Sequence, residues 1–388
     1  MKRFPCYLLA CAAFLTSCTC SGPKESAPPE PGLEEKVELQ LQGLSLREKV
    51  GQLFCVRPEA LDPVFKSGRG YGALSVTERM RTFSENYPVG GIILFSPNID
   101  DPVQLDSLVR HLKALPGAPL LCVDEEGGRV SRIASNRRFQ VERFPQMGSF
   151  AARNTPDEIY RCGLVIGTYL KEYGFDVDFA PVADVNTNPR NPVIGKRAFS
   201  SDPNSAASMA VQFLKGLDEA GIAGCLKHFP GHGDTVGDTH YGFARTNKTW
   251  EELLDCEMLP FKAGIAAGAP IIMVAHISAP KVTGSTVPSS LSEVIIRDKL
   301  RNELGYNGII ITDGMEMGAI SRHYSSAEAA VRSLSAGADV VLDPLDFLSA
   351  FDAVMQAVED GDLTEERIDE SVRRVLLLKA RYFTTVSP

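Results

Sequence analysis

The sequence has little of the chemistry that binds polyanions or nucleobases. Lys and Arg total 40 against 49 Asp and Glu, a formal net charge of -9, and no basic stripe stands out. Nucleic acid is therefore not an expected partner. Aromatic residues make up only 8%, with Trp250 as the single tryptophan, so the sequence does not indicate a stacked-aromatic binding surface.

Two kinds of small motif are also missing. None of the nine cysteines forms a Cys-x-x-Cys pair, which argues against a zinc ribbon and against a redox dithiol. The chain has no Walker-type loop, and no glycine-rich turn follows its first apolar strand, so the sequence does not support phosphate binding.

The overall composition is that of a folded globular chain. Hydrophobic residues are 44% and charged residues 23%, which excludes disorder as the main state, a polytopic membrane protein and a disulfide-rich miniprotein. A length of 388 residues suits one large domain of about 300 residues with attachments, or two modest ones.

The first residues have the pattern of an export signal. Lys2 and Arg3 precede an apolar run that is too short to span a bilayer but suits a signal peptide. The run ends in Leu-Thr-Ser-Cys, which resembles the bacterial lipobox and makes Cys18 the expected site of lipidation. An ordinary secretory signal containing a cysteine is the alternative. We expect a signal peptide over residues 1–17, a flexible tether rich in Pro, Ser and Glu over 18–40, and a catalytic domain over 41–388.

The cysteines of the expected domain are odd in number, widely spaced and mostly set among apolar residues. This pattern predicts buried free thiols. They are Cys55, Cys122, Cys162, Cys225 and Cys256.

Short apolar runs alternate with helical patterns from about residue 40 onward. Continuous apolar runs are typical of strands buried on both faces of a parallel sheet. We expect strands at residues 90–96, 119–125, 176–185, 223–229, 270–277, 307–314 and 338–344. We expect helices at residues 44–54 (with Ser45 as its cap), 157–173, 206–220, 251–267, 291–304 and 364–382.

Seven strand–helix units over about 300 residues favour an α/β fold of the TIM type, a (β/α)8 barrel in a single catalytic domain, with one strand unassigned or irregular. A doubly wound open sheet is the competing architecture.

Polar side chains follow nearly every expected strand. Because the carboxyl ends of barrel strands converge on one mouth, these groups should face a single pocket. They are Asp124, Asp184, Lys227, His228, His276, Asp313 and Asp343.

The segment KHFPGHGDTVGDTH, residues 227–240, contains three of the six histidines in a glycine-rich loop. A metal site is the first interpretation, but Pro230 and the glycines oppose the helix that would align His228 with His232. Acid/base chemistry is the second interpretation, because Asp238 lies two residues before His240 and can hold its tautomer and raise its basicity. A solvated loop with incidental histidines is the third.

This segment resembles the signature of the family 3 glycoside hydrolases, in their β-N-acetylhexosaminidase branch. The motifs LSLREKVGQLF, GGIILF, VDEEGGRVSR, FAPVADVNTNPRNPVIGKRAF, IITDGMEM and GADVVLDP lie around it in the expected order. The resemblance covers nearly the whole chain after the tether.

The resemblance implies a role for particular residues. Asp313 in IITDGMEM matches the nucleophile that forms a covalent glycosyl-enzyme with retention. His240, paired with Asp238, matches the acid/base; it replaces the glutamate that a second domain supplies in related β-glucosidases. The positions that match sugar contacts are Asp124, Arg132, Arg197, Lys227 and His228. Glu316 is interpreted as charge at the start of a helix or as a supporting group, and His232 as a residue that shapes the loop.

The branch removes terminal β-linked N-acetylglucosamine, and it implies no cofactor and no metal. The expected protein is a monomer with a carbohydrate substrate, exported and held on the periplasmic or outer-membrane face by its N-terminal lipid alone. Peptidoglycan fragments, chito-oligosaccharides and host glycans are candidate substrates. The alternatives are a β-glucosidase or xylosidase, a phosphorylase of the same family, and a non-catalytic wall-binding lipoprotein.

Overall fold

We analysed a computed structural model of the chain, which describes residues 32–62, 64, 72–235 and 244–383. Eight parallel strands form one sheet in the order β7-β6-β5-β4-β3-β2-β1-β8. The strands are β1 (Phe54–Val56), β2 (Gly91–Leu94), β3 (Leu120–Val123), β4 (Val177–Asp178), β5 (Ala223–Phe229), β6 (Ile271–Val274), β7 (Ile309–Thr312) and β8 (Val341–Leu342).

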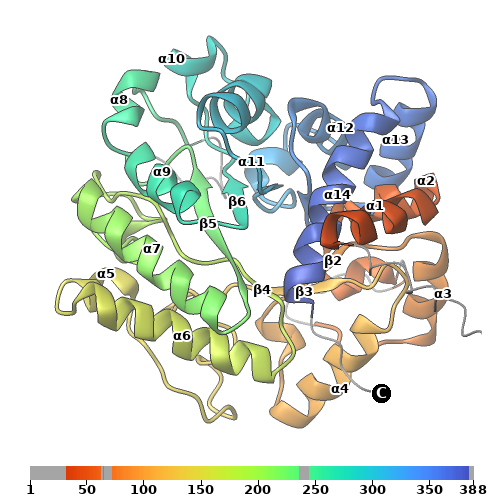
Figure 1. Cartoon of the computed structure of the whole chain (residues 1–388), viewed down its shortest axis with the longest axis horizontal. Coiled ribbons are helices and arrows are strands. Elements are labelled where there is room, and N and C mark those ends of the chain that lie inside the picture. Colours follow the sequence, from red (N-terminus) through yellow and green to blue (C-terminus); the bar gives the residue numbers. More distant parts are fainter. Residues whose placement is uncertain (1–31, 63, 65–71, 236–243, 384–388) are drawn as a thin grey trace, which may run out of the picture. The chain divides into compact units, whose positions relative to one another are not determined.

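The two ends of this sheet meet between β7 and β8. Ile311 and Val340 form a parallel bridge, and the Thr312 N–H donates to the Val340 carbonyl at 3.1 Å. The Thr312 hydroxyl oxygen accepts from the Leu342 N–H at 3.0 Å. These bonds close the sheet into the expected TIM-type (β/α)8 barrel, so the predicted fold class is confirmed (Figure 1).

Helices surround the barrel. The α-helices are α1 (Leu33–Gly43), α2 (Leu46–Gln52), α3 (Glu78–Asn86), α4 (Pro102–Lys113), α5 (Met147–Ala151), α6 (Pro156–Glu172), α7 (Pro203–Glu219), α8 (Trp250–Leu254), α9 (Met258–Ala266), α10 (Pro280–Thr283), α11 (Gly318–Ser321), α12 (Ser326–Ala336), α13 (Phe347–Glu359) and α14 (Glu365–Tyr382). The 3-10 turns are η1 (Pro58–Leu61), η2 (Ser96–Asn98), η3 (Gly195–Arg197) and η4 (Ser289–Leu291), and η5 (Val294–Glu303) is a π-helix.

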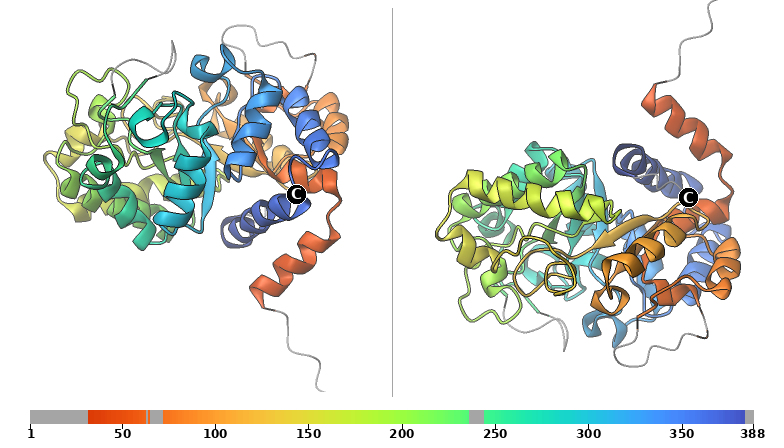
Figure 2. Two further views of the ribbon diagram at one scale, coloured as in Figure 1. Left: turned by 90° about the horizontal axis from the view of Figure 1, so that it is seen from above. Right: turned by 90° about the horizontal axis from the view of Figure 1, so that it is seen from below.

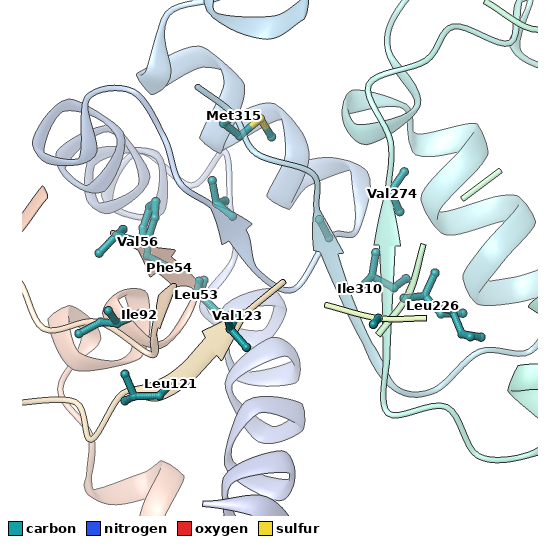
Figure 3. Close-up of a cluster of buried hydrophobic side chains, with 14 of the residues drawn as sticks. Leu53, Phe54, Val56, Ile92, Leu121, Val123, Leu226, Val274, Ile310 and Met315 are labelled. Atoms are coloured by element: carbon teal, nitrogen blue, oxygen red, sulfur yellow. The ribbon is translucent and has the colours of Figure 1, made fainter. Parts of the chain in front are cut away.

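Every strand is buried on both faces, which explains its continuous apolar sequence. In β1, Phe54 and Val56 point outward to the helices, whereas Cys55 points into the barrel. The outward residues Ile92, Leu121 and Ile310 follow the same alternation (Figure 3). Four of the five predicted free thiols are buried and unpaired, and Cys256 is half-buried and unpaired.

One end of the barrel is closed by α14. Val375 and Leu378 of this helix cluster inside the barrel with Leu120 and Ile309, the first residues of β3 and β7. The amino ends of the strands are therefore covered. Helix α1 packs along α14 on the outside of the barrel (Figure 2). An ion pair between Glu38 and Arg373, at 2.9 Å, joins the two helices.

Residues 33–40, expected as the end of the tether, form most of α1, with Val37 buried. The described helices include none that is both long and apolar enough to cross a membrane.

Several element boundaries differ from the expectation. The unassigned strand is β1, which begins directly after the Leu53 cap of α2, so its first residue, Phe54, fell within the predicted helix 44–54. The expected strand 176–185 pairs regularly only at Val177–Asp178, and Pro181 in its middle has no N–H to donate. The expected helix 251–267 is two helices, α8 and α9, and the expected helix 291–304 is the π-helix η5.

Candidate active site

A cavity of about 690 Å³ lies at the carboxyl ends of the strands, the end that α14 leaves open. This volume is in the usual range for a small-ligand site. Its wall contains the predicted nucleophile and all five predicted sugar contacts: Asp313, Asp124, Arg132, Arg197, Lys227 and His228. Because the carboxyl ends of the barrel strands converge, residues as far apart in the sequence as Asp124 and Asp313, 189 positions, lie in one pocket.

One side of the cavity is a network of alternating charges. The Lys227 ammonium, 2% exposed, lies 2.7 Å from Asp124 Oδ1 and 2.7 Å from Glu126 Oε1. The Arg197 guanidinium donates to both oxygens of Glu126, at 2.8 and 2.6 Å. Burial opposes the charge on Glu126, but Arg197 and Lys227 outweigh it and hold the pKa of this carboxyl well below its usual range. Likewise, Asp124 and Glu126 outweigh burial and raise the pKa of Lys227.

The imidazole of His228 is fixed from behind. Its Nδ1 lies 2.7 Å from Asp184 Oδ2, and Asp184 Oδ1 accepts the backbone N–H of His232 at 2.6 Å. Burial alone would raise the pKa of Asp184, but His228 and the other donors lower it, so the carboxylate stays ionised. With Nδ1 committed, Nε2 of His228 is the nitrogen beside Arg197, at 3.4 Å. Asp184 is fully buried beneath the pocket and is not part of its wall.

Asp313 follows β7 directly, and its backbone N–H donates to the Val274 carbonyl of β6 at 2.9 Å. Its Oδ1 accepts the Gly314 N–H at 2.8 Å. Burial would raise the pKa of Asp313, but His228 and the Gly314 N–H together lower it. The carboxylate is therefore ionised at neutral pH, which is the form a nucleophile needs.

His276 shapes the turn that carries Asp313 and does not line the pocket itself. The ring is completely buried, its Nε2 lies 2.9 Å from the Gly314 carbonyl and its Nδ1 2.7 Å from the Ser290 hydroxyl. Burial lowers the pKa of His276, so the ring is neutral. Because a carbonyl only accepts, the proton lies on Nε2 and the Ser290 hydroxyl donates to Nδ1.

A second group of charged side chains lies at the opposite side of the cavity. It consists of Asp343 and Glu316, which the sequence indicated, and of Arg57, which contacts both and which the sequence did not indicate. Arg57, just after β1, donates through Nε to both oxygens of Asp343 at 2.9 and 3.1 Å, and its Nη2 lies 3.6 Å from Glu316 Oε1. Burial and the nearby Asp343 raise the pKa of Glu316 to about 8, against the effect of Arg57. Glu316 is thus largely protonated at neutral pH. Arg57 also lies over the Phe95 ring, 5.0 Å from its centroid.

The motif EGGRVSR forms a loop organised by Glu125. This fully buried carboxylate accepts from the Ser131 hydroxyl at 2.5 Å, from the Tyr169 hydroxyl at 2.9 Å and from three backbone N–H groups of residues 132–134. The loop places the Arg132 guanidinium in the cavity, with Nη2 3.4 Å from Asp124 Oδ2. Glu125 is therefore a structural residue of the loop.

Three of the predicted functional residues lie outside the described residues: Asp238, His240 and Cys18. Their expected roles stay predictions. Arg57 and Phe95 were missed; a strand assignment at 54–56 would have pointed to Arg57, the residue next after it. Glu126 lies in the motif VDEEGGRVSR, but nothing in the sequence indicated its pairing with Arg197.

An eight-stranded parallel barrel with a charged pocket at the carboxyl ends of its strands is a framework that many enzymes use, glycosidases among them. Residues 45–378 match the model of the glycosyl hydrolase family 3 N terminal domain. The chain belongs to glycosyl hydrolase family 3, which confirms the predicted family and the prediction that the protein is a glycoside hydrolase.

Several relatives of the chain have names that state an activity. Beta-hexosaminidase A of Pseudoalteromonas piscicida is 34% identical over 323 residues, 76% of this chain and 54% of that protein. The chain thus spans about half the length of that relative. Beta-hexosaminidase LpqI of Mycobacterium tuberculosis is 35% identical over 305 residues, 76% of each chain. A solved family 3 beta-N-acetylglucosaminidase from Paenibacillus superposes with a TM-score of 0.81 at 35% identity, covering 89% of this chain and 65% of that one.

Proposed function

We propose that the chain is a retaining exo-acting glycosidase that removes terminal β-linked N-acetylglucosamine. The observation that carries this proposal is the ionised Asp313 at the end of β7, in one pocket with Asp124, Arg132, Arg197, Lys227 and His228. The names of the relatives, beta-hexosaminidase and beta-N-acetylglucosaminidase, support the choice of sugar.

The proposed reaction has two steps. In the first, an Asp313 oxygen forms a bond to the anomeric carbon while the bond to the leaving oxygen breaks and His240 donates its proton to that oxygen. In the second, water attacks the anomeric carbon, His240 takes its proton, and the Asp313 carboxylate is released. Asp238 would hold the imidazole in the required tautomer. Two inversions at one carbon give net retention.

The charged network gives the sugar its position. Asp124 is an acceptor for sugar hydroxyls, Lys227 and Arg132 are donors, and His228 presents its Nε2 as an acceptor because its Nδ1 donates to Asp184. Because Lys227 and Arg197 are already held by carboxylates, they lose little entropy on binding, which favours positioning of the ring over Asp313.

The test is release of the aryl group from an aryl β-N-acetylglucosaminide by the full chain, beside Asp313→Asn. We expect the variant to lose at least about 1000-fold in kcat, because the amide is a poor nucleophile. Asp352→Asn, an exposed carboxylate on α13, is the matched control and should keep full activity. Equal activity in Asp313→Asn would mean that the nucleophile lies elsewhere.

The same assay separates the alternatives. A preference for the aryl glucoside or xyloside would indicate a different sugar. A rate that rises with phosphate and yields a sugar 1-phosphate would indicate a phosphorylase. Turnover of none of these substrates would favour a binding protein.

We also propose that the chain is exported and lipidated at Cys18, where a lipobox-like segment ends, and that it acts outside the inner membrane on peptidoglycan fragments, chito-oligosaccharides or host glycans. The test is incorporation of labelled fatty acid in a bacterial host. The native chain should take up label and Cys18→Ser should not. Uptake of label by both would contradict lipidation at Cys18.

A further inference from the structure

His232 was assigned a loop-shaping role, yet its ring forms part of the cavity wall. The side chain is 2% exposed, and its Nε2 has no hydrogen-bond partner among the residues that the structure describes. A buried polar atom without a partner costs free energy, so Nε2 needs a partner from outside the described residues, and in a cavity wall a water or a bound ligand can provide it.

The ring is fixed at every other point. Its backbone N–H donates to Asp184 at 2.6 Å, and Nδ1 lies 2.8 Å from the Thr235 hydroxyl. The ring also contacts the ring of His228 edge-on, with centroids 5.9 Å apart. Nε2 is therefore held in one place and cannot turn away to find a partner.

The protonation state of Nε2 follows from the Thr235 hydroxyl, which has one proton. This hydroxyl donates to the His232 carbonyl at 2.9 Å, so it can only accept from Nδ1. The proton of the neutral ring is then on Nδ1, and Nε2 has a bare lone pair. Burial lowers the pKa of His232, which is consistent with a neutral ring. Nε2 is an acceptor that requires a donor.

The barrel order suggests which donor. Asp313 follows β7 and Asp124 follows β3, four strands apart among eight, so they lie on opposite sides of the mouth. A sugar with its anomeric carbon at Asp313 directs C4 toward Asp124. The side of the pocket at β5, with Lys227 and His228, has the denser set of polar groups. This side suits the edge of the sugar ring that carries two adjacent polar substituents, at C2 and C3.

We propose that His232 is a substrate contact whose Nε2 accepts the hydrogen bond of the 2-acetamido N–H. This rests on the proposed function. C2 is bonded to the anomeric carbon, so its substituent lies close to Asp313, and the charge of Asp313 acts on the His232 ring. An amide N–H can only donate and Nε2 can only accept, so the pair is matched in a way that a substituent without a proton cannot reproduce.

The test compares two aryl glycosides on the full chain: the β-N-acetylglucosaminide and the β-glucoside with a 2-O-acetyl ester. The ester keeps the carbonyl and the methyl group but has no N–H. We expect the wild type to prefer the amide by about 10- to 100-fold in kcat/KM, the usual cost of leaving a buried acceptor unpaired.

Two variants isolate the lone pair. His232→Phe keeps a ring against His228 without an acceptor, so the amide preference should fall to about 1. His232→Gln places a carbonyl oxygen near the position of Nε2 and should keep most of the preference. A structural role would lower kcat/KM for both substrates equally and leave the ratio unchanged, which would overturn the proposal.

The wild type alone provides an independent check if His232→Phe does not fold. A wild-type ratio near 1, with good turnover of the amide, would show that this contact is wrong while the proposed function holds. No turnover of the amide would show that the proposed function is wrong, and the contact with it.

Discussion

The carboxylate of Glu126 offers a sharp test of how the charged network stabilises the pocket. Glu126 is 3% exposed and accepts three charged hydrogen bonds, two from Arg197 and one from Lys227 at 2.7 Å. Glu126→Gln keeps the shape of the side chain and removes its charge. Lys227 then keeps only its ion pair with Asp124 and Arg197 loses its ion pair with Glu126, so we expect the free energy of unfolding to fall by about 3–5 kcal/mol at pH 7.

The loss should depend on pH in a defined direction. The pKa of Glu126 is lowered in the folded chain, so in acid the unfolded state binds a proton that the folded state does not. The contribution of Glu126 is present above the unfolded pKa, near 4.5, and declines as the pH falls toward the folded pKa. Between pH 4.5 and 3.5 the gap between wild type and variant should narrow by about 1 kcal/mol, because the unfolded carboxyl is already half protonated at pH 4.5.

Urea unfolding followed by the fluorescence of Trp250, the single tryptophan and buried in α8, measures this gap. Glu142→Gln is the control, because Glu142 makes a similar two-bond pair with Arg161 on the surface and should cost less than about 1 kcal/mol. A Glu126→Gln loss as small as that of the control, or a gap that does not change with pH, would refute the reasoning.

Two further predictions concern the rest of the pocket. Glu316 has a pKa raised to about 8, so the folded state favours its protonated form and stability is lost as the pH rises from 4.5 through 8. Glu316→Gln should therefore gain stability relative to wild type between pH 5 and pH 9 in thermal unfolding, and a constant difference would contradict a buried acid. In the loop after β5, a Cβ on Gly233 would lie 1.9 Å from the Val185 carbonyl oxygen, so Gly233→Ala should cost about 2–3 kcal/mol in urea unfolding. Gly43→Ala, with nothing within 4 Å, is its control and should be neutral or slightly stabilising; equal effects would mean that the loop adjusts freely.

The barrel could be predicted from the sequence because seven of its strands are flanked by turns and buried on both faces. The strand β1 could not, because the helical pattern of α2 runs into it with only Leu53 between them. Missing β1 also concealed Arg57, which follows that strand and contacts the pocket residues Asp343 and Glu316. Periodicity likewise does not distinguish the π-helix η5 from an α-helix, since both present an apolar face.

The sequence indicated the pocket residues where a charged or reactive side chain lies at the end of a predicted strand, as for Asp124, Lys227 and Asp313. What the sequence could not reveal is which charges neutralise one another. The pairing of Glu126 with Arg197 joins residues 71 positions apart, and the raised pKa of Glu316 depends on Asp343 at the end of another strand. The first pairing follows from the adjacency of β3 and β4 in the sheet, and the second from barrel closure, which brings the ends of β7 and β8 together.

The central claim is that Asp313 forms a covalent bond to the sugar. A 5-fluoro N-acetylglucosaminyl fluoride should react at Asp313 and leave a slowly hydrolysed glycosyl-enzyme. The fluorine on C1 is a good leaving group, so the glycosyl-enzyme forms, whereas the fluorine on C5 slows both its formation and its hydrolysis. Peptide mass mapping of the full chain should find one added sugar, on the peptide that contains Asp313, and none in Asp313→Asn. An adduct on another carboxylate, such as Glu316, or turnover without any adduct would contradict the account.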